Sequence, residues 1–166
     1  MTTNIYLLGA GILGALHLTD ETKQALSSSD EVYVLHPDTE LIDFIATKYG
    51  CVVHDLAGLY GNHTIRRDVY KEISETLVRK AASGARVSFI VHGHPLFLVS
   101  ASEYTLDLAA SAGLNVKVLS AVSSFEPAIG EIVEIDRGGE EVAWFFPVLR
   151  PSELSLLKVE ANQVVF

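Results

Sequence analysis

Apolar residues along the chain alternate between short unbroken runs and longer stretches with helical spacing. Five runs have the length and β-branched content of buried strands: residues 5–8, 31–35, 51–53, 87–91 and 116–119. Between the runs, apolar residues recur every three or four positions, most regularly at Val69, Ile73, Leu77 and Ala81. This alternation predicts an α/β fold with a doubly wound, mostly parallel sheet.

Capping and turn residues set the limits of the expected helices. Thr19 suits the N-cap of a first helix, which the polar residues 27–30 end. Gly50 ends a second helix, because glycine readily takes the left-handed conformation found there. We expect a third helix over residues 65–82 and a fourth from about residue 101 to residue 112.

The pattern changes after Glu126. Residues 131–135 and 141–146 are strand-like and flank a glycine-containing turn at residues 136–140, which predicts a β-hairpin. We therefore divide the chain into an α/β domain over residues 1–126 and a β-rich tail over residues 127–166. The tail either completes the same domain or forms an oligomer interface.

Charge narrows the choice of partners. Twelve basic against 21 acidic side chains give a formal net charge of -9. Such a field repels phosphate backbones and anionic lipids, which disfavours nucleic acids and membrane surfaces as partners. No apolar run reaches the roughly 18 to 20 residues of a membrane span, and the first residues carry no basic charge. We therefore expect a cytoplasmic protein.

Three segments directly follow predicted strands, where open parallel sheets bind their ligands. The first contains Gly9, Gly11 and Gly14 in the pattern Gly-x-Gly-x-x-Gly, and the others are residues 92–97 and 120–124. The glycines permit a close approach of the backbone to a ligand. Dinucleotide-binding folds share this pattern but need an acidic residue where the second strand ends, and none stands there, so NAD is the second choice of cofactor. A turn that only connects strand to helix is the alternative without a ligand.

The second and third segments resemble loops of the tetrapyrrole-methylase superfamily. Residues 93–97 match a loop that begins Gly-Asp-Pro or Gly-His-Pro, and residues 121–123 are similar to its Gly-Val-Ser segment, with Ala121 in place of glycine. With the glycine-rich segment, the three matches follow the order of the superfamily. The resemblance implies S-adenosylmethionine as cofactor and the following binding residues: Gly9, Gly11, Gly14, His92, Gly93, His94, Pro95, Leu96, Phe97, Ser100, Val122 and Ser123.

A second resemblance, to the borosin methyltransferases that N-methylate peptide backbone amides, rests on Tyr60, Arg66 and Tyr70. The family places an arginine six residues after a first tyrosine and a second tyrosine four residues later. Arg67 makes the choice of arginine ambiguous. The resemblance implies that Tyr60, Arg66 and Tyr70 are catalytic. An arginine near a phenol favours the phenolate, which suits a general base, and the pair would stabilise the oxyanion of a deprotonated amide. The alternative is that the tyrosines pack and the arginine is solvated.

Other chemistries find less support. His92 and His94 lie two residues apart, and the sequence offers no third ligand nearby. Two ligands are too few for a typical metal site, so we expect no bound metal. A Gly-x-Ser-x-Gly nucleophile elbow is absent, which disfavours a serine hydrolase.

The tetrapyrrole methylases also have a second α/β domain that closes over the cofactor. The resemblance spans about residues 4–126, and the roughly 40 residues that follow are too few for such a domain. Three outcomes stay open. A partner subunit, in a homodimer or another homo-oligomer, supplies the missing walls around a small-molecule or peptide substrate. The tail replaces them in a smaller enzyme. Or the chain no longer transfers methyl groups, and is a binding or assembly module or runs a different reaction in the same cleft.

Overall fold

The computed structural model describes residues 2–61 and 63–125, which build one five-stranded sheet in the order β3-β2-β4-β1-β5. All strand pairs are parallel. The predicted α/β fold with a parallel sheet is therefore confirmed. The strands are β1 (Ile5–Gly9), β2 (Glu31–Leu35), β3 (Val52–Asp55), β4 (Val87–Val91) and β5 (Val116–Val118).

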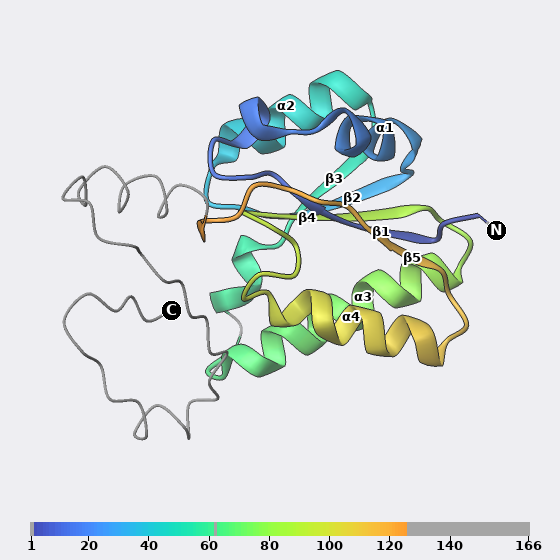
Figure 1. The fold of residues 1–166 in the computed structure, drawn as a ribbon. Helices are drawn as coiled ribbons and strands as arrows, with labels where there is room; N and C mark the ends of the chain where they lie inside the picture. Colours follow the sequence, from blue (N-terminus) through green and yellow to red (C-terminus); the bar gives the residue numbers. More distant parts are fainter. Residues whose placement is uncertain (1, 62, 126–166) are drawn as a thin grey trace, which may run out of the picture.

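Four helices cover the sheet, two on each face (Figure 1). Helices α1 (Asp20–Ser28) and α2 (Thr39–Tyr49) lie on one face, and α3 (Arg66–Ala82) and α4 (Ser100–Ser111) lie on the other. Each face has its own apolar core. The central strand β4 is buried along its whole length, because its side chains alternate between the two cores.

Helix α1 begins and helix α2 ends where their capping residues predict. The Thr19 side chain accepts a hydrogen bond from the backbone N–H of Thr22 at 3.1 Å, as an N-cap does. Gly50 takes a left-handed conformation, with φ of 63°, after the last turn of α2. These local signals explain why the observed helices agree closely with the expected ones.

The glycine-rich segment forms a turn, with a detail that the sequence did not reveal. It leads into a short 3-10 helix, η1 (Gly14–His17), before α1 starts at Asp20, directly after its expected N-cap Thr19. The imidazole of His17 shapes this turn. Its Nδ1 accepts hydrogen bonds from the backbone N–H groups of Ile12 and Leu13, at 3.1 and 3.3 Å, and so closes the segment into a compact turn.

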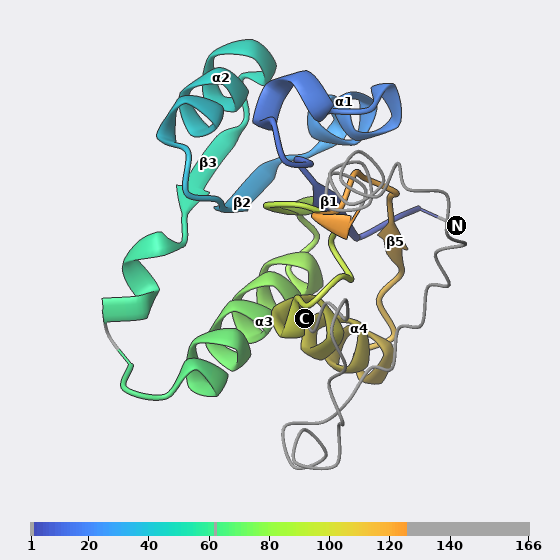
Figure 2. The same cartoon turned by 60° about the vertical axis from the view of Figure 1, so that its left-hand side comes forward.

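The connections create a switch point in the middle of the sheet. The chain leaves β1 toward the face with α1 and leaves the neighbouring strand β4 toward the face with α4. The helices that follow these two strands therefore lie on opposite faces of the sheet, and the connections to them start side by side at its carboxyl edge, which is where doubly wound sheets bind ligands. A second 3-10 helix, η2 (Ala57–Gly61), leaves the end of β3 and leads toward α3, as Figure 2 shows.

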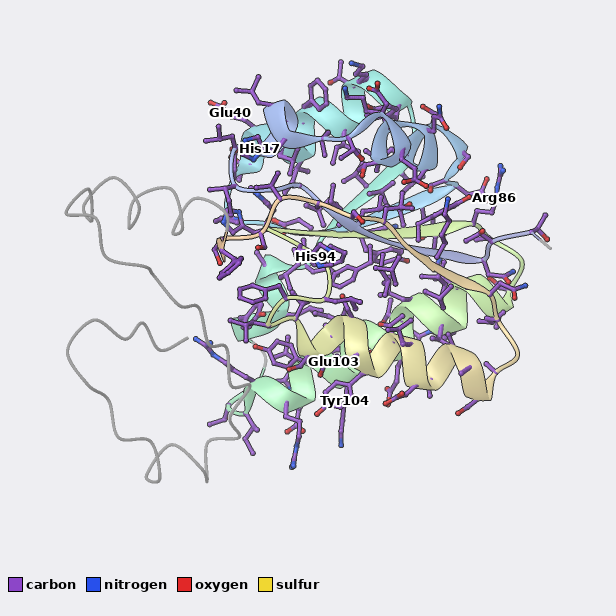
Figure 3. All side chains as sticks on the ribbon, in the orientation of Figure 1. His17, Glu40, Arg86, His94, Glu103 and Tyr104 are labelled. Carbon is purple, nitrogen blue, oxygen red and sulfur yellow. The ribbon has the colours of Figure 1, made fainter. Side chains whose placement is uncertain are left out.

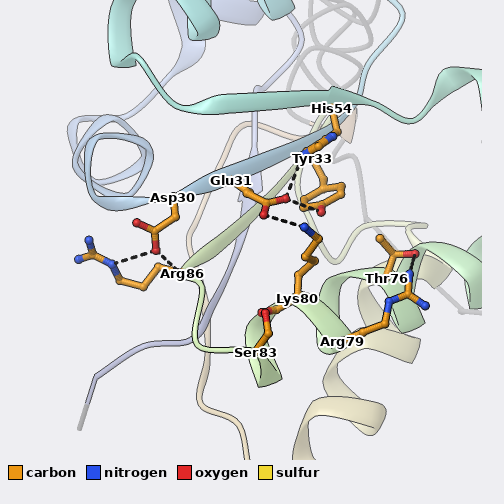
Figure 4. A network of polar contacts seen from close by, with 9 residues as sticks. All are labelled: Asp30, Glu31, Tyr33, His54, Thr76, Arg79, Lys80, Ser83 and Arg86. Carbon is orange, nitrogen blue, oxygen red and sulfur yellow. Dashed lines mark hydrogen bonds and ion pairs between the residues drawn. The ribbon is translucent and has the colours of Figure 1, made fainter.

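At the end of the sheet opposite the carboxyl edge, a polar network joins α3 to β2 and β3 (Figure 4). Both oxygens of the Glu31 carboxylate are bound, one by Lys80 at 2.9 Å and the other by the Tyr33 hydroxyl at 2.8 Å and His54 at 2.9 Å. The hydrogen bond from Lys80, followed by that from Tyr33, lowers the pKa of Glu31. Burial and then Glu31 raise the pKa of Tyr33. This network lies away from the carboxyl edge and serves the fold.

The predicted hairpin over residues 131–146 lies outside the described residues, and so does the division of the chain at residue 126. Among the residues that are described, no helix has both the length and the apolar character that crossing a membrane would need.

Candidate functional site

The three segments that the sequence singled out meet at Gly9, the last residue of β1. We call them the β1 loop (residues 9–14), the β4 loop (residues 92–97) and the β5 loop (residues 120–124). A Cβ atom placed on Gly9 would lie 2.2 Å from the Gly93 carbonyl oxygen, 2.5 Å from the Ala121 methyl group and 3.0 Å from the Pro95 ring. Only glycine allows the loops to come this close, since atoms of two different loops fill the space that a side chain would need.

Backbone hydrogen bonds hold the β1 loop to the β4 loop. The N–H of Gly93 donates to the carbonyl of Gly11 at 2.9 Å, and the N–H of Gly11 donates to the carbonyl of Gly93 at 3.3 Å. Both glycines have positive φ, 63° for Gly11 and 73° for Gly93. Residues with a side chain rarely adopt this backbone conformation, so the pairing depends on glycine at both positions.

The β1 loop is not arranged to bind a phosphate. Its N–H groups at Ile12 and Leu13 already donate to His17, and a 3-10 helix of four residues, not a full α-helix, begins at Gly14. In dinucleotide-binding folds these elements face the pyrophosphate. Here β4 also lies between β1 and β2, whereas the dinucleotide fold pairs them. The geometry therefore argues against NAD, the second choice of cofactor.

The remaining predicted cofactor residues line the same edge. His94 turns the β4 loop, because its Nδ1 accepts from the N–H of Leu96 at 3.1 Å and its carbonyl accepts from the N–H of Phe97. Figure 3 shows His94 on the α3 and α4 side of the sheet and His17 on the α1 and α2 side, both at the end opposite Arg86. Ser100 begins α4, Val122 is half-buried and Ser123 is buried.

Tyr60 and Tyr70 come together near the same edge. Their ring centroids are 6.4 Å apart and the rings are almost perpendicular. Tyr60 belongs to η2, and Arg66 is the first residue of α3, so Tyr70 lies one turn further along that helix. Tyr70 packs against the core under α3, and its carbonyl accepts from Ser74, which also donates to Ala101 at the start of α4.

The pKa of Tyr60 shifts in the direction opposite to the one that an arginine alone would produce. Burial and then Tyr70 raise the pKa of the Tyr60 hydroxyl above its ordinary value, and Arg66 lowers it by less. Arg66 lowers the pKa, as expected, but burial and Tyr70 together raise it by more. In this structure Tyr60 is therefore a protonated phenol at neutral pH, which suits a hydrogen-bond donor.

Two histidines that the sequence analysis did not assign to the site have clear structural roles. His17 closes the β1 loop, and His36, the residue after β2, contacts His92 of the β4 loop with 3.1 Å between His36 Nε2 and His92 Nδ1. No local pattern indicates the second contact, because the partners are 56 positions apart. Over residues 2–61 and 63–125, no group of three or more His, Cys, Asp or Glu side chains is placed to hold a metal ion.

The fold and the loop geometry define a class, the doubly wound α/β domains with a switch point at the carboxyl edge of a parallel sheet. The family can also be assigned. The chain belongs to the tetrapyrrole (corrin/porphyrin) methylases, whose family model matches residues 4–163. The matched range extends beyond residue 126, where the sequence analysis placed the end of the resemblance.

Curated relatives confirm the resemblance to borosin methyltransferases. The chain is 30% identical over 139 residues to a methyltransferase/ribosomally synthesized type I borosin cyclic peptide precursor of Cerrena unicolor, covering 77% of this chain and 34% of the relative. It is 33% identical to the methyltransferase/lentinulin A precursor of Lentinula edodes, covering 73% and 29%. The chain thus spans about a third of the length of these relatives.

Solved structures share the fold. Uroporphyrin-III-C-methyltransferase from Thermus thermophilus superposes with a TM-score of 0.54 at 23% identity, over 72% of this chain and 48% of the other. A diphthine synthase superposes with a TM-score of 0.59 at 20% identity, over 76% and 47%. These matches support the predicted architecture of the sheet and its helices.

Proposed function

We propose that this chain binds S-adenosylmethionine at the carboxyl edge of its sheet and takes part in N-methylation of a peptide-like amide. The observation that carries the proposal is the convergence of the β1, β4 and β5 loops on Gly9, on the same sheet edge as the pair of Tyr60 and Tyr70. Relatives named as methyltransferases and cyclic peptide precursors support it.

The residues present fit such a cofactor. Gly9 leaves no room for a side chain because the β4 and β5 loops pack against it, and this packing brings backbone and small groups of three loops together at the carboxyl edge. Gly93, Pro95 and Val122 would hold the cofactor, and Leu96 offers exposed apolar surface beside them. When bound, S-adenosylmethionine supplies an electrophilic methyl group to a nucleophile.

The tyrosine pair and Arg66 would act on the substrate amide. An amide nitrogen becomes nucleophilic only as it gives up its proton, to solvent water or to a tyrosine phenolate, and negative charge then grows on the amide oxygen. The protonated Tyr60 hydroxyl and the Arg66 guanidinium suit stabilisation of that oxygen. For Tyr60 to accept the proton instead, its own proton must first leave, which the raised pKa resists at neutral pH.

Calorimetry with S-adenosylhomocysteine tests cofactor binding in the full chain. We expect the wild-type protein and Gly58→Ala to bind alike, because a Cβ on Gly58 meets nothing within 4 Å. Gly93→Ala should bind about fivefold to thirtyfold more weakly, since holding a φ of 73° costs a residue with a side chain about 1–2 kcal/mol. Absence of binding by the wild-type chain, also in the presence of any partner chain, would overturn the cofactor assignment.

Methyl transfer to a peptide, followed by mass spectrometry, tests the role of Tyr60. Tyr60→Phe removes only the hydroxyl, and Tyr104→Phe makes the same change on α4. We expect a large loss of kcat for Tyr60→Phe with cofactor affinity unchanged, and none for Tyr104→Phe. If Tyr60 acts as the base, the wild-type rate should also rise with pH from 7 to 9, because its pKa is raised. Equal rates for the two variants would exclude a catalytic Tyr60.

A second candidate function rests on exposed apolar side chains at the same edge. Leu16 is 84% exposed, Leu98 71%, Leu13 59% and Ile65 54%. Large exposed apolar side chains that gather on one edge favour a contact surface, so an assembly module is the alternative. It predicts self-association that Leu16→Lys weakens, measured by light scattering in the micromolar range. A wild-type protein that stays monomeric throughout this range would contradict assembly by self-association.

A further inference from the structure

His36 and His92 stand side by side because of the sheet register. Leu35 of β2 pairs with Val91 of β4, so the next residue of each strand lies at the same level of the carboxyl edge. Val34 and Ile90 point into the core under α1 and α2, and side chains two residues further along point to the same face. His36 is buried and His92 is exposed, with ring centroids 4.9 Å apart.

The hydrogen bonds around His36 determine where its proton sits. The backbone N–H of Asp38 donates to His36 Nδ1 at 3.1 Å, so this nitrogen is an acceptor and carries no proton. A neutral imidazole then carries its proton on Nε2. Burial and then the neighbouring His92 lower the pKa of His36, which keeps it neutral at neutral pH.

The same reasoning extends to His92. His36 Nε2 lies 3.1 Å from His92 Nδ1, and because His36 Nε2 is the donor, His92 Nδ1 must accept. His92 then carries its proton on Nε2. No other hydrogen bond to His92 occurs within residues 2–61 and 63–125, and its ring is exposed directly before Gly93.

We propose that His36 is a positioning residue that locks His92 in the tautomer with the proton on Nε2, so that His92 presents one fixed N–H donor to an acceptor group of the ligand. The carboxylate of the methionyl part of the cofactor and a carbonyl of the substrate have the required chemistry. The assignment of a ligand to this donor rests on the proposed function. The lock itself depends only on the chain from Asp38 through His36 to His92.

Nitrogen-15 NMR of the imidazoles tests the lock in the protein without ligand. We expect His36 and His92 both to be protonated on Nε2, with a scalar coupling between His36 Nε2 and His92 Nδ1 across the hydrogen bond. In His36→Leu the coupling disappears and His92 exchanges between tautomers. His54→Gln is the matched control, because His54 binds Glu31 and not the loops. A wild-type His92 protonated on Nδ1, or unchanged His92 signals in His36→Leu, would overturn the proposal.

Calorimetry with S-adenosylhomocysteine then tests whether the cofactor uses the donor. We expect His36→Leu to bind about threefold to tenfold more weakly, the ratio that corresponds to one hydrogen bond. His36→Gln should recover most of the affinity, because its amide can donate to His92. Weakened binding with this rescue supports the cofactor as acceptor, and wild-type affinity in His36→Leu overturns it. If the wild-type protein binds no cofactor, the proposed function fails, and the NMR result alone still decides whether His36 locks His92.

Discussion

Replacing Gly9 by alanine should disrupt the point where the three loops meet. The new methyl group would lie 2.2 Å from the Gly93 carbonyl oxygen and 2.5 Å from the Ala121 methyl group, far inside ordinary contact. One of these neighbours is backbone, so a side-chain rotation does not relieve the overlap. The β4 and β5 loops must move, and the two hydrogen bonds between Gly11 and Gly93 are then strained or broken.

The expected cost follows from two contributions. Overpacking a closely packed site costs about 1–3 kcal/mol, and each lost hydrogen bond costs about 0.5–1.5 kcal/mol. We therefore expect Gly9→Ala to lower the free energy of unfolding by about 2–6 kcal/mol. With a urea slope of about 2 kcal/mol per molar, the midpoint of unfolding falls by about 1–3 M.

Urea unfolding followed by circular dichroism measures this change. Gly58→Ala is the matched control, because a Cβ there meets nothing within 4 Å and φ is not positive. The control should be neutral or gain up to about 1 kcal/mol, since alanine restricts the unfolded chain. If Gly9→Ala unfolded at the wild-type midpoint, the close approach of the three loops would be refuted.

Three further predictions concern the stability of the domain. Glu31→Gln should destabilise it by about 1–2 kcal/mol at pH 7, a value reduced for the partial exposure of Lys80. Because the folded pKa of Glu31 lies below the unfolded value near 4.5, this stabilisation exists above that value and is lost as pH falls through the folded pKa, so urea midpoints of wild type and variant should converge once the pH is below the folded pKa. Thr19→Ala removes the N-cap of α1 and should cost about 1 kcal/mol in the same assay, with an unchanged midpoint as the contradicting result. Leu98→Gly should leave the midpoint unchanged or raise it by up to about 1 kcal/mol in free energy, because Leu98 has a φ of 60°; a clear loss would show that its side chain stabilises the fold.

Features set by neighbouring residues were predictable from the sequence. The burial of β4 follows from its unbroken apolar run, and the end of α2 follows from Gly50, because both depend on local geometry. The glycine-rich segment was predicted as a ligand loop but not as a turn closed by His17. A single histidine after the last glycine is too common a pattern to indicate that contact.

Features set by the order of the strands were not predictable from local patterns. No pattern in the sequence indicates that β4 lies between β1 and β2, and the contact between His36 and His92 exists only because of that order. The pairing of Tyr60 with Tyr70 was expected from their spacing around Arg66. The raised pKa of Tyr60 was not, because it depends on burial, which the spacing does not reveal.

The carboxyl edge is divided at Gly9 into two sides with different chemistry. His36 and His92 point to the face covered by α1 and α2, whereas Tyr70 packs in the core under α3. Because these groups share no hydrogen bond, the effects of changing them should be independent. We expect His36→Leu to weaken cofactor binding and Tyr60→Phe to reduce turnover. Each change lowers kcat/KM for the cofactor, and in the double variant kcat/KM should fall by the product of the two single fold-changes. A double variant that deviates from this product by more than about twofold would show that one ligand contact joins the two sides across Gly9.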